Sequence, residues 1–112
     1  MVLVKEWEHE GLKCLIRRHN TLGHLCGYVV LPEGHYAYKK DYYDIDVDVH
    51  GGLTYANMED GKWVVGFDCA HLGDYVPGSM FCRVAGEHEW TVDEVEKETN
   101  QLARQLARKA VI

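Results

Sequence analysis

Only the C-terminal segment, from Thr91 onward, repeats its apolar residues at helical spacing. Thr91 is suited to cap this helix, and Glu94, three residues on, completes a capping box. Acidic residues come early in the segment and basic residues come late, which suits the helix dipole. One face of the predicted helix carries Val92, Val95, Thr99, Leu102, Ala103, Leu106 and Ala110. A face of this kind must pack against another layer of the fold.

The preceding residues alternate as strands do, and glycine-containing turns separate them. A break at Glu10-Gly11 predicts a hairpin between the first two strands. The segment Pro32-Glu33-Gly34 ends the third strand, and Asn57–Gly61 is predicted as the turn before the last. The predicted strands are one that starts at residues 2–4, then Leu12–Arg17, His24–Leu31, Asp44–Tyr55 with an interruption at Gly51-Gly52, and Lys62–Ala70.

Several strands followed by one amphipathic helix predict an α+β fold. We expect an antiparallel sheet of about five strands with one long C-terminal helix packed on one face, in a single domain spanning residues 1–112. Residues 35–43 are predicted to form an irregular loop with room for one helical turn. Residues 71–90 are predicted to form a long loop that includes a short extended piece at Met80–Val84.

Composition narrows the choice of partners. The chain has 12 Lys and Arg against 18 Asp and Glu, a net charge of -6, whereas nucleic-acid binding needs a basic surface. No apolar run approaches the ~20 residues of a membrane-spanning helix. The N-terminal stretch is too short and too acidic for a signal peptide. We therefore expect neither a nucleic-acid nor a membrane partner, and a location in the cytoplasm.

The cysteines indicate a reducing environment. Cys14, Cys26, Cys69 and Cys82 form no C-x-x-C pair, and a small secreted domain would carry a denser framework. We expect reduced thiols that mostly behave as small buried apolar residues. Cys69 and His71 lie two apart, which on a strand is too far for a direct hydrogen bond, so we assign no cysteine catalysis.

The segment Asp44–His50 alternates apolar and ionisable residues. On the predicted strand, Ile45, Val47 and Val49 point to one face and Asp44, Asp46, Asp48 and His50 to the other, with successive side chains on a face roughly 7 Å apart. Such a row of carboxylates needs water, neighbouring cations, a metal ion or a hydroxyl-rich ligand to offset its charge. A solvated outer sheet face is the simpler interpretation.

Polar residues gather around this row. Gly51-Gly52 follows it directly, which favours either a β-bulge or the close approach of a ligand. The fifth strand leads into Asp68, His71 and Asp74, and a short turn would bring these residues opposite residues 48–50. We therefore predict a ligand-binding pocket formed by Asp46, Asp48, His50, Gly51, Gly52, Tyr55, Asp68, His71 and Asp74.

A metal centre is the alternative use of these residues. Histidine and aspartate ligate zinc, manganese or iron, and the candidate set is Asp48, His50, Asp68, His71 and Asp74. The spacing matches no sharp metal motif. We expect no cofactor and no tightly bound metal, and keep a metal-dependent hydrolase as an alternative.

Three strings in the sequence are long enough to indicate a family: CGYVVLPEGH, YYDIDVDVHGGLTY and WVVGFDCAHLGD followed by VPG. On these strings, from Gly23 to Gly78, and on its C-terminal helix, the chain resembles a family of small uncharacterised bacteriophage and prophage proteins. Relatives tend to carry proline after the loop histidine and glycine before the Tyr-Asp pair. Here Tyr36 follows His35, and Lys39-Lys40 precede Asp41. The resemblance implies a viral protein in the host cytoplasm.

Small phage proteins with a polar cleft often act against host immunity, and the function suggested here is an analogy with them. We expect a protein that binds a small nucleotide-like ligand and serves as a counter-defence sponge, sequestering a nucleotide-derived immune signal without turnover. The alternatives are the metal-dependent hydrolase and an inhibitor that covers a host protein with its acidic face. A homo-oligomer is compatible with each of these functions.

Overall fold

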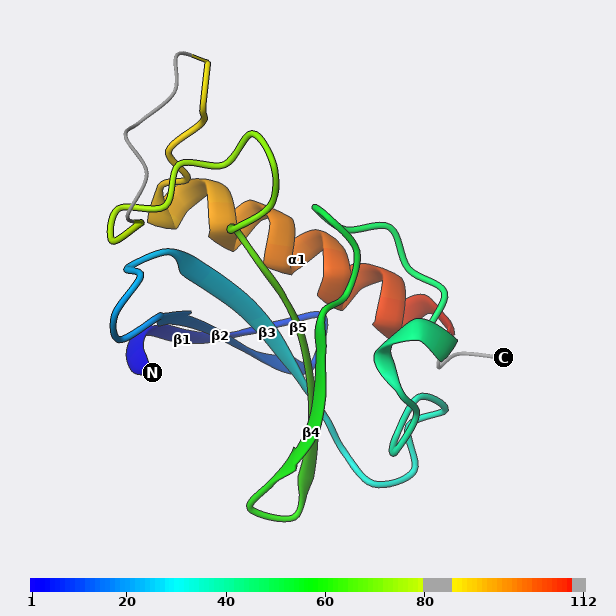
Figure 1. Ribbon diagram of the computed structural model, residues 1–112. Coiled ribbons are helices and arrows are strands. Elements are labelled where there is room, and N and C mark those ends of the chain that lie inside the picture. The colour runs from blue at the N-terminus through cyan, green and yellow to red at the C-terminus, as the bar shows by residue number, and fades with distance from the viewer. Residues whose placement is uncertain (80–85, 110–112) are drawn as a thin grey trace.

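The computed structural model describes residues 1–79 and 86–109. The described residues confirm the predicted α+β class: a five-stranded antiparallel sheet carries one long helix across one face (Figure 1). The predicted piece at Met80–Val84 and the predicted helix residue Ala110 lie outside the described residues. The elements are β1 (Val2–His9), β2 (Leu12–Arg18), β3 (Leu25–Leu31), the 3₁₀ turn η1 (Tyr42–Asp44), β4 (Tyr55–Glu59), β5 (Lys62–Asp68) and α1 (Val92–Lys109).

Two tight hairpins form the edges of the sheet, whose strand order is β1-β2-β3-β5-β4. Glu10 and Gly11 join β1 to β2 with φ angles of 54° and 78°. Asp60 and Gly61 join β4 to β5 with φ angles of 49° and 78°. Two consecutive positive φ angles are typical of a type I′ turn, whose twist matches that of the strands. The first turn lies where the sequence predicted it.

The predicted fourth strand, Asp44–Tyr55, is wrong. The strand in this part of the chain is β4, which begins at Tyr55, so the strand pairing expected to bring residues 48–50 opposite the end of the fifth strand is absent from the described residues. Residues 45–50 instead run alongside α1 (Figure 1). Ile45 and Val49 are buried in the core beneath the helix, and the partly buried Val47 packs against this core. The alternating pattern therefore predicted the buried side of this segment correctly but not its partner.

The turn before β5 is shorter than the predicted Asn57–Gly61. Asn57 and Glu59 belong to β4, and only Asp60 and Gly61 form the turn. Tyr55 consequently pairs with Gly66 in the sheet. Because β4 begins only at Tyr55, residues 48–50 lie outside the ladder between β4 and β5. His50 can therefore approach the end of β5 only through the loops.

The helix begins and packs as its sequence pattern predicted. The Thr91 N–H donates to Glu94 Oε1 at 2.9 Å and the Glu94 N–H donates to Thr91 Oγ1 at 3.2 Å, which completes the capping box. The described apolar face is buried against β2 and β3, and five of its residues have no exposed surface: Val95, Thr99, Leu102, Ala103 and Leu106.

Close packing of α1 on the sheet depends on Gly27 of β3. A Cβ atom at this position would overlap the Thr99 hydroxyl and lie 2.6 Å from Phe67 Cε1. We expect Gly27→Ala to lower the free energy of unfolding by about 2 kcal/mol, because an overpacked core must shift side chains or backbone. Urea denaturation measures this change. In a Thr99→Ala background the added cost of Gly27→Ala should be smaller, and equal costs in both backgrounds would contradict the proposed overlap.

The face of the sheet away from α1 has its own smaller core: Leu15, Cys26, Tyr28, Val30 and Val64. The guanidinium of Arg17 lies 4.6 Å from the centroid of the Tyr28 ring and donates to both carboxylate oxygens of Glu59, at 2.6 and 3.0 Å. The hydrogen bonds from Arg17, together with the one from Tyr55, hold the pKa of Glu59 below its usual range despite partial burial. A polar layer therefore covers this second core.

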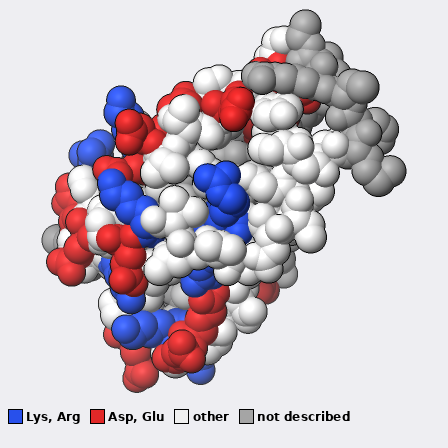
Figure 2. All heavy atoms as spheres, turned by 90° about the vertical axis from the view of Figure 1, so that its left-hand side faces the viewer, with Lys and Arg blue, Asp and Glu red and all other residues white. Residues whose placement is uncertain are grey.

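Charges of both signs are interspersed over the side of the molecule shown in Figure 2, which is the left-hand side of Figure 1. No broad basic area appears on this face. A polyanion held by phosphate contacts alone would need such an area.

Candidate functional site

The Asp74 carboxylate is the centre of a polar cluster beside the N-terminal end of α1. Its side chain is only 4% exposed. It accepts hydrogen bonds from His50 Nε2 at 2.9 Å, from the His71 backbone N–H at 3.0 Å and from Trp90 Nε1 at 3.0 Å. These donors come from three separate loops, so Asp74 links them. We call His50, Asp68, His71, Asp74 and Trp90 the histidine–aspartate cluster.

The ionised form of Asp74 is favoured in the folded protein. Burial raises the pKa of this carboxyl, but the hydrogen bonds from His50, the His71 N–H and Trp90 outweigh it, so the pKa lies below its ordinary value of 3.8. An ionised carboxylate only accepts hydrogen bonds, so Nε2 of His50 must carry the proton that it donates. In a neutral His50, Nδ1 is then the lone-pair nitrogen, able to accept a hydrogen bond or a proton.

His71 lies beside His50, with ring centroids 5.6 Å apart. Its Nε2 is buried and, among the described residues, has no hydrogen-bond partner. It makes a charge contact with Asp68, whose Oδ1 lies 3.3 Å away. Gly51 packs against the same ring edge, and a Cβ atom there would overlap it. Gly51 is thus needed for close approach as well as for its positive φ of 69°.

Asp68 is held in place by its own neighbours. It accepts from the Thr54 hydroxyl at 2.9 Å and from the Ala70 N–H at 3.0 Å. Two histidines, each facing an aspartate, therefore lie side by side, half-buried, at the end of β5. The arrangement can accept and donate hydrogen bonds to a polar molecule and can exchange protons with it.

The structure brings together five of the nine predicted site residues: His50, Gly51, Asp68, His71 and Asp74. Gly52 lies next to them in a turn, where its N–H donates to Val49 O at 2.8 Å. Because residues 48–50 lie outside the β4–β5 ladder, these residues meet through loops rather than through paired strands.

The other three predicted residues lie elsewhere. Asp46 is exposed near Tyr36, whose pKa is raised by burial and, to a lesser extent, by the Asp46 charge. The side chain of Asp48 is exposed, and its backbone bonds to α1. Tyr55 lies on the opposite face of the sheet, where it contacts Tyr28 edge-on and donates to Glu59.

Trp90 and Thr54 are the members of this environment that sequence reasoning missed. The centroid of the Trp90 ring lies 4.5 Å from that of His50, and the exposed His88 ring contacts Trp90 edge-on with centroids 5.4 Å apart. Trp90 directly precedes the capping residue Thr91, so its position at the start of a predicted helix was a usable signal. Thr54 offered none, since it lies in what the pattern assigned to a strand.

Cysteine chemistry finds no support at this site. Cys14, Cys26 and Cys69 are free and buried, and burial raises the pKa of each thiol. Thiols of this kind are poor nucleophiles. Cys82 lies outside the described residues. Within residues 1–79 and 86–109, no group of three or more His, Cys, Asp and Glu side chains is arranged to hold a metal ion.

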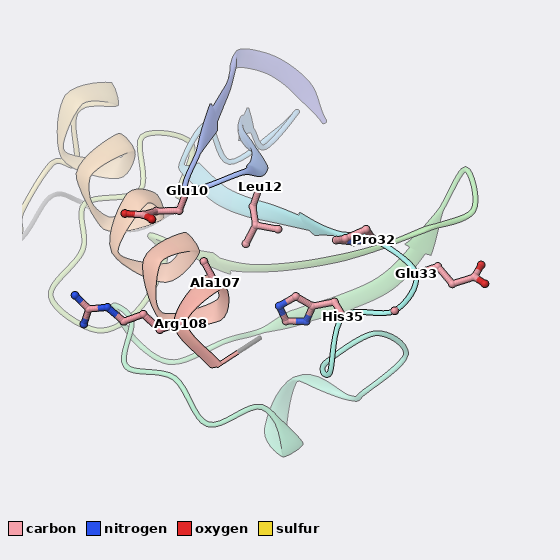
Figure 3. A pocket seen from close by; sticks show the side chains of 8 residues that line it. Glu10, Leu12, Pro32, Glu33, His35, Ala107 and Arg108 are labelled. Atoms are coloured by element: carbon pink, nitrogen blue, oxygen red, sulfur yellow. The ribbon is translucent and has the colours of Figure 1, made fainter. Parts of the chain in front are cut away.

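A cleft lies at the C-terminal end of α1, away from the histidine–aspartate cluster. It has a volume of about 790 Å³, and in Figure 3 Leu12, His35 and Ala107 surround its middle. His35 accepts at Nδ1 from the Ala37 N–H and donates from Nε2 to Leu106 O, so both ring nitrogens serve the fold. None of the predicted site residues lines this cleft. A small cavity of about 30 Å³ borders Trp90.

No protein-family model matches this chain, and comparison with curated proteins and with solved structures gave no match. The resemblance to small phage proteins stays a prediction. In the part of the chain that the structure describes, no helix has the length and apolar character needed to cross a membrane.

The depressed pKa of Asp74 predicts a loss of stability in acid. A carboxyl with a lowered folded pKa stabilises the fold above its unfolded pKa of 3.8, and this contribution disappears as pH falls through the folded value. Below about pH 4 the free energy of unfolding should therefore fall more steeply in the parent than in Asp74→Asn. Urea denaturation from pH 7 to pH 3 measures both slopes, and parallel slopes would contradict the assignment.

Proposed function

We propose that the protein binds a small polar ligand at the histidine–aspartate cluster. One observation carries this proposal. A buried carboxylate fixes His50 beside His71, whose buried Nε2 lacks a hydrogen-bond partner among the described residues. Buried polar atoms in folded proteins usually have hydrogen-bond partners, so an imidazole nitrogen held only by a 3.3 Å charge contact with Asp68 is a candidate contact for water or a ligand.

The chemistry of the cluster limits the ligand. Two carboxylates and a net charge of -6 disfavour a highly charged polyphosphate. Nδ1 of His50 and the oxygens of Asp68 accept hydrogen bonds, so hydroxyl and N–H groups are the expected partners. The aromatic rings of Trp90 and His88 favour a flat ring system. A nucleoside-like molecule with few phosphates fits these requirements.

The finer proposal rests on the phage resemblance and on analogy. A viral protein that binds such a ligand without turnover would act as a sponge in the host cytoplasm, lowering the concentration of a nucleotide-derived immune signal. Sequestration is preferred over hydrolysis on the same analogy.

Isothermal titration calorimetry tests the binding proposal. The probes are cyclic dinucleotides, ADP-ribose derivatives and simple nucleotides. We expect at least one to bind the parent, and His71→Ala to weaken that binding by about tenfold or more, since it removes hydrogen-bonding groups at the site. Asp48→Asn is the matched control, because its carboxylate is exposed outside the cluster. No binding by any probe would contradict the proposal.

The exposed acidic segment favours a second candidate function. Asp44, Asp46 and Asp48 are exposed along one segment, and Tyr43 beside them is 73% exposed. This surface suits a basic host protein, as an occluding inhibitor would require. Native mass spectrometry of protein purified from infected cells separates the two functions. A small-mass adduct favours the ligand, and a protein complex that is lost in Asp46→Asn/Asp48→Asn favours the inhibitor.

A further inference from the structure

Ile45 has extended backbone angles, and residues 46–49 belong to no helix or strand, so no strand pairs with residues 45–49 in the described parts of the chain. Side chains of α1 take the place of a neighbouring strand. Gln105 Oε1 accepts from the Asp48 N–H at 2.7 Å, and Gln105 Nε2 donates to Asp48 O at 2.7 Å. One amide side chain thus satisfies both backbone groups of Asp48, as a paired residue in a sheet would.

Glu98 makes the third contact between α1 and this segment, at His50, two residues after Asp48. Its Oε2 accepts from the His50 backbone N–H at 2.7 Å. Glu98 and Gln105 are seven residues apart on α1, so they lie two turns apart on the same side of the helix. His50 is therefore held at its backbone by α1 and at its ring by Asp74.

The apolar contacts of residues 45–50 do not by themselves fix the position of His50 along α1. Ile45 and Val49 are buried and attach the segment to the core. Dispersion contacts of this kind are non-directional and tolerate small sliding movements, whereas short hydrogen bonds define position and direction. The bonds from Glu98 and Gln105 therefore determine where along α1 His50 is placed.

We propose that Glu98 and Gln105 are positioning residues of the histidine–aspartate cluster. By fixing the backbone of Asp48 and His50, they align the His50 imidazole with Asp74 and keep Nδ1 as the acceptor nitrogen. The role in ligand affinity rests on the binding function proposed above. The role in ring alignment does not, and it can be measured in the unliganded protein.

The test compares three α1 variants with a control. Glu98→Ala and Gln105→Ala remove the contacts, whereas Glu98→Gln keeps an oxygen that can accept from the His50 N–H. Gln101→Ala is the control, because Gln101 is exposed on the same helix. The readout is the ¹⁵N chemical shifts of the two His50 ring nitrogens, which report the tautomer, followed by calorimetry with whichever probe binds the parent.

We expect Glu98→Ala and Gln105→Ala to move the ¹⁵N shifts toward a mixture of tautomers and to weaken ligand binding by about tenfold, as loss of a hydrogen bond to a positioned group does. Glu98→Gln and Gln101→Ala should resemble the parent. Unchanged ¹⁵N shifts in Glu98→Ala and Gln105→Ala would overturn the inference, whatever the ligand does. Altered shifts in a protein that binds no probe would support the positioning role while contradicting the proposed function.

Discussion

Replacing Leu102 by aspartate is expected to lower the free energy of unfolding by about 4 kcal/mol, among the largest effects of a single substitution. Leu102 has no exposed surface and belongs to the core between α1 and the sheet. An aspartate there would either bury an unpaired charge or force the helix away from the sheet. Urea denaturation monitored by circular dichroism measures the change.

Two further substitutions make this prediction specific. Gln101→Asp introduces the same charge one residue earlier on an exposed position of the helix, and we expect it to change stability by less than about 0.5 kcal/mol. Leu102→Met keeps the apolar volume and should cost less than about 1.5 kcal/mol. If Leu102→Asp were as stable as Gln101→Asp, the packing of α1 described here would be wrong.

Asp74→Asn is expected to have the largest effect on the candidate site. The asparagine side chain keeps one acceptor oxygen, but its NH₂ group cannot accept from His50, Trp90 or the backbone. At least one buried donor loses its partner, so we expect the free energy of unfolding at pH 7 to fall by about 1–3 kcal/mol. The His50 tautomer should lose its preference, and any ligand that depends on Nδ1 should bind more weakly.

The matched control for this substitution is Asp48→Asn. It removes an equal charge from a carboxylate that is exposed and lies outside the cluster. Stability and the His50 ¹⁵N shifts should then stay close to those of the parent. If Asp74→Asn and Asp48→Asn changed the stability and the His50 ¹⁵N shifts equally, the net charge of the protein, rather than the buried hydrogen bonds, would account for the changes.

Much of the fold could be predicted from local patterns. Helical spacing and the Thr91–Glu94 capping box located α1, because both depend on residues within one or two turns. Glu10-Gly11 located a hairpin, since only a few residue types adopt two consecutive positive φ angles. The burial of the described cysteines and the α+β class also agree with the sequence.

The candidate site was only partly predictable. His50, His71 and Asp74 do come together, but the argument for it assumed a strand that is absent. Trp90, Glu98 and Gln105 take part through side-chain hydrogen bonds to residues between 16 and 57 positions away. No local pattern marks the contacts of Glu98 and Gln105, because the polar face of a helix looks the same whether it meets solvent or a neighbouring loop.

Local sequence pattern and tertiary packing account for different properties of the segment Asp44–His50. Alternation of apolar and acidic residues determined that Ile45 and Val49 face the core while Asp46 and Asp48 face solvent. An extended chain satisfies that pattern beside a strand or beside a helix. The choice was made by the tertiary structure, because the backbone groups of Asp48 and His50 needed partners and α1 offered Gln105 and Glu98 at hydrogen-bonding distance.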